Sequence, residues 1–100
     1  MSKITDSARQ KECSIRIPRV CNWDKDTTVW AHANGSAAGK GIGMKSLDPL
    51  GAYACSDCHD CYDRRSRPPP GWTYDDVRLA FWEGHARSLR ILIDEGLVKC

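Results

Sequence analysis

The sequence predicts a small α+β domain with short strands, one short helix and one long C-terminal helix. The chain has 100 residues, short β-branched runs occupy its first half, and a helical apolar stripe runs through its last third. A chain of this length buries only about two-thirds of its unfolded surface. Small domains often add a metal or disulfides to reach stability, and six cysteines are present here.

One domain is expected to span residues 1–100. Residues 1–12 would form an N-terminal lead, residues 13–66 the core and residues 72–97 a C-terminal helix. Short strands are predicted in three alternating or β-branched runs: SIRIP (14–18), VWAHA (29–33) and LGAYAC (50–55). A turn is predicted at residues 21–28. A loop is predicted at 34–46, where four glycines occur.

Two helices are predicted after the strands. The run SDCHDCYDRR (56–65) has helical composition, with Ser56 as a possible N-cap. The segment RPPPG (67–71) would break the chain rigidly. The long helix would begin at Thr73, whose capping-box partner is Asp76, and would stop near Gly96. Its apolar stripe comprises Val77, Ala80, Phe81, Gly84, Leu89, Leu92, Ile93 and Leu97.

Composition argues against membrane and secreted proteins. The hydrophobic fraction is 41%, and no apolar run approaches the roughly 18 residues that cross a bilayer. The chain opens with MSKITDSARQKEC, which lacks the apolar stretch of a secretion signal. We therefore expect a cytoplasmic protein, in a compartment where clustered cysteines bind metal more often than they form disulfides. The net charge of +2 says little about partners.

Four cysteines are spaced as a candidate structural zinc site. Cys55 and Cys58 form a C-x-x-C motif at a predicted strand-to-helix junction, which lets two thiolates approach one tetrahedral ion. Cys13 and Cys21 bracket a short segment and can supply the second pair. Cys61 and Cys100 are interpreted as free thiols.

Other readings of these cysteines remain open from the residues alone. They include buried free thiols, a disulfide framework, and a thioredoxin-like C-x-x-C, which the predicted element order does not favour. The run Cys55-x-x-Cys58-His59 is also the c-type haem attachment pattern. That reading leaves Cys13 and Cys21 without a role.

The histidines suggest a second site. His59 and Asp63 are four residues apart and would share one face of the short helix, whereas Cys58 points about 100° away. A surface ion pair is the simplest alternative for this spacing. His32 ends a predicted strand, and His85 is expected to be a packed or surface histidine of the long helix.

Several of these features together resemble the HNH endonucleases. They are a histidine at a strand end (His32), a polar residue before the next strand (Asp48), and Cys55-x-x-Cys58-His59 at the start of a helix. The match is closer to the YbcO-like nucleases of bacteriophages and prophages, and it is carried by ECSIRIPRVCN, TTVWAH, GKGIGMKSLD, ACSDCHDCYDRR and EGHARSLRILIDEGLVK. The resemblance implies a zinc-stabilised ββα-metal finger within residues 13–66, formed by a β-hairpin and the short helix.

The resemblance also implies hydrolysis of DNA phosphodiester bonds. His32 would be the general base, Asp48 would take the place of the middle residue that holds the loop, and His59 with Asp63 would bind a catalytic cation. Mixed imidazole and carboxylate ligation accepts Mg²⁺, Mn²⁺, Ni²⁺ or Zn²⁺. Four basic residues are expected to contact DNA phosphates: Lys40, Lys45, Arg64 and Arg65.

Two positions depart from the wider HNH pattern. Many members carry a metal ligand directly before the base, where this chain has Ala31, and Asp48 replaces the middle asparagine. The catalytic metal shell is thus incomplete in the sequence, and Asp48, phosphate or water would complete it. The alternative hypothesis is a non-catalytic zinc-stabilised module that binds nucleic acid or protein. The oligomeric state is not indicated.

Overall fold

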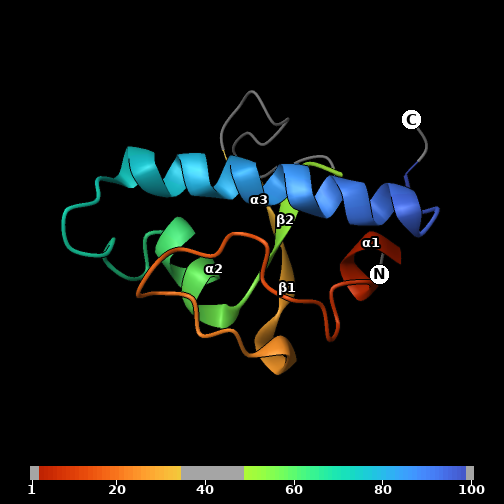
Figure 1. Ribbon diagram of the computed structural model, residues 1–100, viewed down its shortest axis with the longest axis horizontal. Helices are drawn as coiled ribbons and strands as arrows, with labels where there is room; N and C mark the ends of the chain where they lie inside the picture. Colours follow the sequence, from red (N-terminus) through yellow and green to blue (C-terminus); the bar gives the residue numbers. More distant parts are fainter. Residues whose placement is uncertain (1–2, 35–48, 99–100) are drawn as a thin grey trace.

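The computed structural model describes residues 3–34 and 49–98. Its elements are α1 (Lys3–Asp6), the 3-10 helix η1 (Lys25–Thr27), β1 (Val29–His32), β2 (Gly51–Ala54), α2 (Ser56–Tyr62) and α3 (Tyr74–Asp94). In Figure 1, α3 extends along the long axis above the two strands, and α2 and α1 lie on opposite sides of these strands. The predicted α+β class is confirmed.

The two strands form an antiparallel pair. Their register joins Val29 to Ala54, Trp30 to Tyr53, Ala31 to Ala52 and His32 to Gly51. Because side chains alternate between the faces of a strand, Trp30 and His32 share one face of β1. Gly51 is required beside Trp30, since a Cβ at this position would lie 2.8 Å from the indole ring.

The predicted strand at residues 14–18 is wrong. Within the described residues the sheet has two strands, β1 and β2. Arg16 has a φ of 58°, which interrupts any extended conformation, although the Ser14 amide still donates to the Tyr53 carbonyl at 2.8 Å. Ile15 and Ile17 are buried, so their alternation reflects packing of an irregular segment rather than strand pairing.

The long helix has the capping residues that the sequence predicts at its start and just after its end. The capping box is confirmed, with reciprocal hydrogen bonds between Thr73 and Asp76. The helix itself ends at Asp94, three residues before the predicted limit. Gly96 follows with a φ of 77°, and the Leu97 amide donates to the Leu92 carbonyl at 2.9 Å, which is the hydrogen bond of a Schellman motif.

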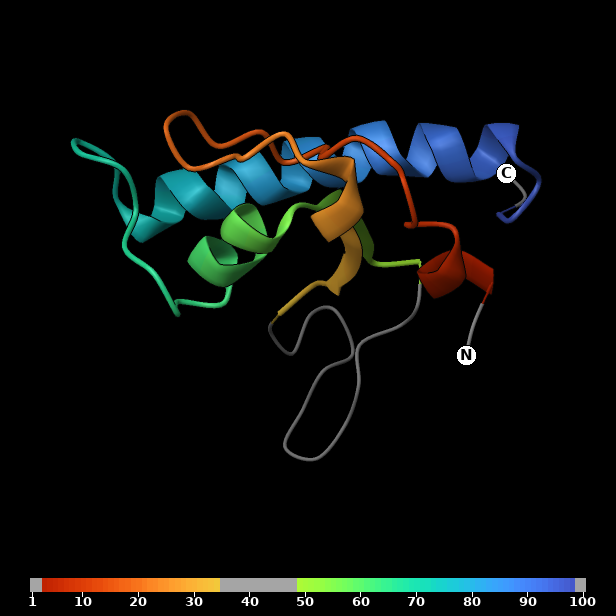
Figure 2. The same cartoon turned by 90° about the horizontal axis from the view of Figure 1, so that it is seen from below.

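The apolar core has two parts, one on each side of the hairpin. The larger part brings together α2, the first half of α3 and the buried residues of segment 13–17. It includes the stacked rings of Tyr62 and Phe81, whose centroids are 3.9 Å apart. The smaller part joins α1 to the last turns of α3 through Ile4, Trp30, Tyr53 and Leu92. In Figure 2, seen from below, α2 and α1 are again well separated, on opposite sides of the strands.

Membrane-spanning character is absent from the described residues. None of the helices in residues 3–34 and 49–98 combines the length and hydropathy that crossing a bilayer requires.

We expect the packing at Gly84 to tolerate no added methyl group. A Cβ there would lie 2.9 Å from both the Ile15 Cα and the Ser14 carbonyl oxygen. Overpacking costs about 1–3 kcal/mol, against about 1 kcal/mol that alanine gains over glycine in a helix. Gly84→Ala should therefore lower the free energy of unfolding by up to about 2 kcal/mol in urea titration. The exposed neighbour Glu83 provides the control: Glu83→Ala should change it little, and a stabilised Gly84→Ala variant would contradict this packing.

Candidate metal centre and active site

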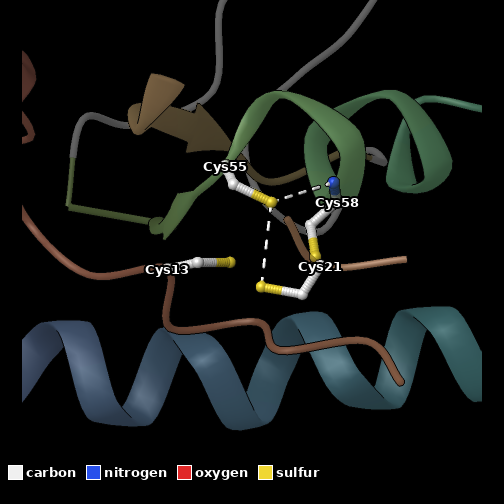
Figure 3. Close-up of side chains that lie close together, drawn as sticks. All are labelled: Cys13, Cys21, Cys55 and Cys58. Carbon is white, nitrogen blue, oxygen red and sulfur yellow. Dashed lines mark hydrogen bonds between the residues drawn. The ribbon is translucent and has the colours of Figure 1, made fainter. Parts of the chain in front are cut away.

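Four cysteine side chains converge at the start of α2. Cys13 and Cys21 come from the irregular N-terminal segment, and Cys55 and Cys58 from the β2–α2 junction. Their sulfur atoms all lie within 4.8 Å of one another. Figure 3 shows the four sulfurs pointing into one common space.

The spacing of the sulfurs fits a tetrahedral ion. With Zn–S bonds of about 2.3 Å, the sulfur atoms of a tetrahedral site lie about 3.8 Å apart. The Sγ atoms of Cys21 and Cys55 lie 3.9 Å apart. Cys13, Cys55 and Cys58 are buried, and Cys21 is partly buried. The cluster can therefore hold a metal ion such as zinc.

The first turn of α2 is arranged around the same sulfurs. Cys55 is the N-cap, and its sulfur accepts from the Cys58 amide at 3.4 Å, so the predicted N-cap at Ser56 is wrong. Asn22, next to Cys21, donates to the Ser56 hydroxyl at 3.1 Å and to Asp57 at 3.0 Å. These bonds tie the N-terminal segment to the helix start beside the cluster.

The electrostatics of the cluster favour a bound cation. Burial raises the pKa of Cys21 to about 12, and hydrogen bonding with Cys13 and Cys55 raises the pKa of Cys58. Hydrogen bonds with Cys13 and Cys58 instead lower the pKa of Cys55. A divalent cation supplies the positive charge that makes the remaining thiolates favourable.

The described cysteines are free thiols: Cys13, Cys21, Cys55, Cys58 and Cys61. This finding argues against the disulfide framework. Haem attachment would use only the C-x-x-C motif and His59, so it does not explain why Cys13 and Cys21 also lie beside this motif. Cys61 is buried and its sulfur donates to the Arg67 carbonyl at 3.7 Å, outside the cluster. Cys100 lies beyond the described residues.

His59 and Asp63 form the second group of interest. Their Nε2 and Oδ2 atoms lie 3.0 Å apart, and their side chains are 29% and 26% exposed. Cys58, one position earlier, is fully buried. One turn of α2 therefore directs a thiol inward and an accessible imidazole–carboxylate pair outward. The hydrogen bond from His59 is the main cause that lowers the pKa of the Asp63 carboxyl.

Asn34 is a site residue that the sequence did not reveal. Its side-chain amide donates to the Oδ1 of Asp63 at 3.2 Å, and its backbone amide donates to the Tyr62 hydroxyl at 2.8 Å. Asn34 thereby connects the chain just after β1 to the end of α2. Its position two residues after His32 was the available signal, but an asparagine beside a glycine is an ordinary turn residue.

His32 stands at the end of β1 and is partly exposed. It does not join His59 and Asp63 in a convergent metal-binding group, since the cysteine quartet is the group found among the described residues. His85 has the packed role expected of it: its Nδ1 lies 2.8 Å from the carbonyl of Gly51, the strand partner of His32.

The predicted DNA-contacting residues are only partly described. Lys40, Lys45 and Asp48 lie outside the described residues. Arg65 contacts carboxylates, with its Nε 3.0 Å from Asp60 and a terminal nitrogen 3.3 Å from Asp63. The guanidinium carbon of Arg64 lies 3.9 Å from the ring centroid of Tyr74. Both arginines therefore have protein partners beside the His59–Asp63 pair.

The model of the family described as "Putative nuclease YbcO" matches residues 2–97. The chain belongs to the YbcO family. Two YbcO proteins, "Putative nuclease YbcO" of Escherichia coli (strain K12) and "Putative nuclease ybcO" of Enterobacteria phage 82, are each 37% identical to it over 99 residues, which is 99% of both chains.

A solved structure shares the fold. It is described as "Structure of a putative bacteriophage protein from Escherichia coli str. K-12 substr. MG1655" and is 35% identical to this chain. The match has a TM-score of 0.74 and covers 92% of this chain and 98% of the solved one. The arrangement of helices and strands is therefore one that a related protein also adopts.

We expect about one tightly bound zinc per chain, measured by elemental analysis. Removing one ligand by Cys13→Ser or Cys58→Ser should unfold the domain, because a structural zinc contributes on the order of 10 kcal/mol to folding. Circular dichroism would report the loss of helix.

Cys61→Ala is the matched control for these variants. Cys61 is as buried as Cys58 and lies on the same helix, so this variant should keep both its zinc and its fold. A wild-type protein that is metal-free yet fully folded would contradict the zinc assignment.

Proposed function

We propose that this YbcO-family chain is a metal-dependent HNH-type endonuclease that hydrolyses DNA phosphodiester bonds. The observation that carries the proposal is the His59–Asp63 pair, held at 3.0 Å on the accessible side of α2. This helix directly follows a hairpin whose first strand ends in His32, which is the element order of a ββα finger. The relatives' names, which describe nucleases, support the same activity.

The His59–Asp63 pair places two possible ligands of one cation side by side. The Nε2 and Oδ2 atoms lie 3.0 Å apart on the accessible side of the helix, so both groups could hold the same ion once the hydrogen bond between them is given up. This donor set suits Mg²⁺, Mn²⁺, Ni²⁺ or Zn²⁺. A cation held by His59 and Asp63 would act as a Lewis acid at the scissile phosphate.

The remaining roles fall to neighbouring side chains. His32 would accept the proton of the attacking water, the general-base task for which histidine is most often used. Asn34 would keep Asp63 oriented through its 3.2 Å hydrogen bond, as outer partners of metal-binding carboxylates commonly do. The structural zinc would hold the start of α2, and so the direction of His59, in place.

The departures from the HNH pattern have a structural counterpart. Ala31 is buried at 1% exposure and points to the face of β1 opposite His32, so this position serves core packing. Asp48, phosphate oxygens and water would complete the cation's shell. Free thiols gathered around a metal site suit a reducing compartment, which supports action on DNA in the cytoplasm of the host cell.

One observation favours a non-catalytic binding module instead. Asp63 already contacts His59, Asn34 and Arg65, so its charge is balanced within the protein as in a structural ion pair. Under this alternative the zinc-stabilised domain would bind nucleic acid or protein without cleaving it. Finding zinc supports both functions equally, so an activity measurement separates them.

We expect the protein to nick supercoiled plasmid when Mg²⁺ or Mn²⁺ is added. His32→Ala should lower the rate by about 10²- to 10⁴-fold, the usual contribution of a general base. Asp63→Asn should also abolish most cleavage, because it removes a negatively charged ligand. Gel electrophoresis of the plasmid forms measures both effects.

Asp60→Asn is the control for Asp63→Asn. Asp60 is on the same helix and also contacts Arg65, but it does not contact His59 in the structure, so cleavage should persist. Zinc content and melting temperature show that each variant is folded. Wild-type protein that retards DNA in a gel but cleaves none with any divalent ion would support the binding module.

A further inference from the structure

A surface pocket of about 390 Å³ opens between the end of α2 and the start of α3. Six residues line it: Arg64, Arg65, Ser66, Arg67, Pro68 and Tyr74. Its volume falls within the range of small-ligand sites, which are about 300–1,000 Å³. The lining residues carry three guanidinium groups and a hydroxyl beside a proline and a tyrosine ring, and the surface that they turn toward the pocket is mostly apolar. A nucleotide combines an anionic phosphate with a flat base, and guanidinium groups beside apolar surfaces can bind both parts.

The pocket is built on a fixed backbone. The Arg65 amide donates to the Asp60 carbonyl at 2.8 Å, and the buried Cys61 thiol donates to the Arg67 carbonyl. Three consecutive prolines follow at 68–70, and these restrict the chain further. The three arginines are therefore presented by a segment that loses little freedom on binding a ligand.

Arg64 and Tyr74 form a stacking surface at this pocket. The guanidinium carbon lies 3.9 Å from the tyrosine ring centroid, which is cation–π distance. The Tyr74 hydroxyl donates to the Tyr62 carbonyl, and this hydrogen bond fixes the position of the ring. Arginine planes and tyrosine rings are both groups on which unpaired bases stack.

The pocket adjoins the proposed catalytic pair. Arg65 lines it and also contacts Asp63 at 3.3 Å, and Asp63 contacts His59. Asp60 and Asp63 offset the charge of Arg65. Within the described part of the chain, Arg64 and Arg67 have no carboxylate partner, so their charges remain available to a phosphate.

We propose that this pocket binds one unpaired nucleotide of a DNA strand, next to the scissile phosphate that the cation held by His59 and Asp63 would contact. The base stacks on the Arg64–Tyr74 surface, and Arg67 and Ser66 bind the attached phosphate. A base within a duplex has both faces covered by its neighbours, so the pocket selects DNA with a single-stranded or distorted region. The inference rests on the proposed nucleic-acid function and adds the class of substrate.

The test is equilibrium binding, measured by fluorescence anisotropy without added divalent cations. The probes are a labelled oligodeoxynucleotide and a blunt duplex of the same sequence. Wild-type protein should bind the single strand more tightly. Tyr74→Leu should weaken single-strand binding by about 5- to 150-fold, the loss of one stacked base, and change duplex binding by less than about twofold. Tyr74→Phe keeps the ring but loses the hydrogen bond to the Tyr62 carbonyl, so it should weaken single-strand binding less than Tyr74→Leu does.

Arg64→Gln and Arg90→Gln form a matched pair. Arg90 lies near the other end of α3 and pairs with Asp94, so its loss removes the same charge away from the pocket. Arg64→Gln should weaken single-strand binding selectively, whereas Arg90→Gln should affect both probes slightly and equally. Zinc content and melting temperature confirm that the variants are folded.

Either of two results would overturn the inference: wild-type protein without preference for the single strand, or pocket variants that bind it as tightly as Arg90→Gln does. Plasmid nicking is scored separately. If wild-type protein cleaves DNA but the pocket variants bind the single strand normally, the pocket inference fails and the nuclease proposal stands. If the pocket variants lose single-strand binding selectively but wild-type protein cleaves nothing, the pocket inference stands and the nuclease proposal fails.

Discussion

The convergence of four thiols is the constraint on which the rest of the domain depends. Between Cys13 and Cys21 the chain has no regular structure, and Arg16 and Arg19 both adopt positive φ angles that non-glycine residues avoid. Such backbone persists only where its surroundings hold it. The sulfur cluster supplies that hold, because it joins this segment to the start of α2 within 4.8 Å. The chain is short, and a metal held by these thiols would add stability that a small core lacks.

The same cluster determines where the neighbouring site faces. Cys58 and His59 are consecutive on α2, so their side chains diverge by about 100°. With Cys58 fully buried among the other thiols, His59 is directed outward together with Asp63, which lies one turn further on. The thiol cluster on one face of a short helix thus fixes the direction of the His59–Asp63 pair on another face, although the two groups share no side chain.

Asp63 connects the separate parts of the proposed active region. It contacts His59 on α2, Asn34 after β1, and Arg65 in the pocket. These partners lower the pKa of its carboxyl below the ordinary value. Its contribution to stability is therefore present above the pKa of the unfolded chain, about 3.9, and is lost as the pH falls through the lower folded value. At neutral pH the carboxylate remains charged for either a cation or its protein partners.

The sequence by itself determined the features that a few neighbouring residues decide. The capping box forms between Thr73 and Asp76, which are three positions apart. The C-x-x-C motif and the His59–Asp63 pair likewise each lie within about one turn of helix. The grouping of Cys13 and Cys21 with the C-x-x-C motif was also predictable from their spacing, although the residues alone left the disulfide and haem readings open.

Only the tertiary structure decided what depends on distant residues. Alternation of Ile15 and Ile17 resembled a strand, but both are buried in the larger part of the core, where Ile15 packs beside Gly84 of α3. Asn34 and Asp63 meet across 29 positions, and the pocket joins Arg64 to Tyr74 across a proline-rich turn. Neither contact has a local pattern, since each exists only once the core has placed the hairpin and the two helices together.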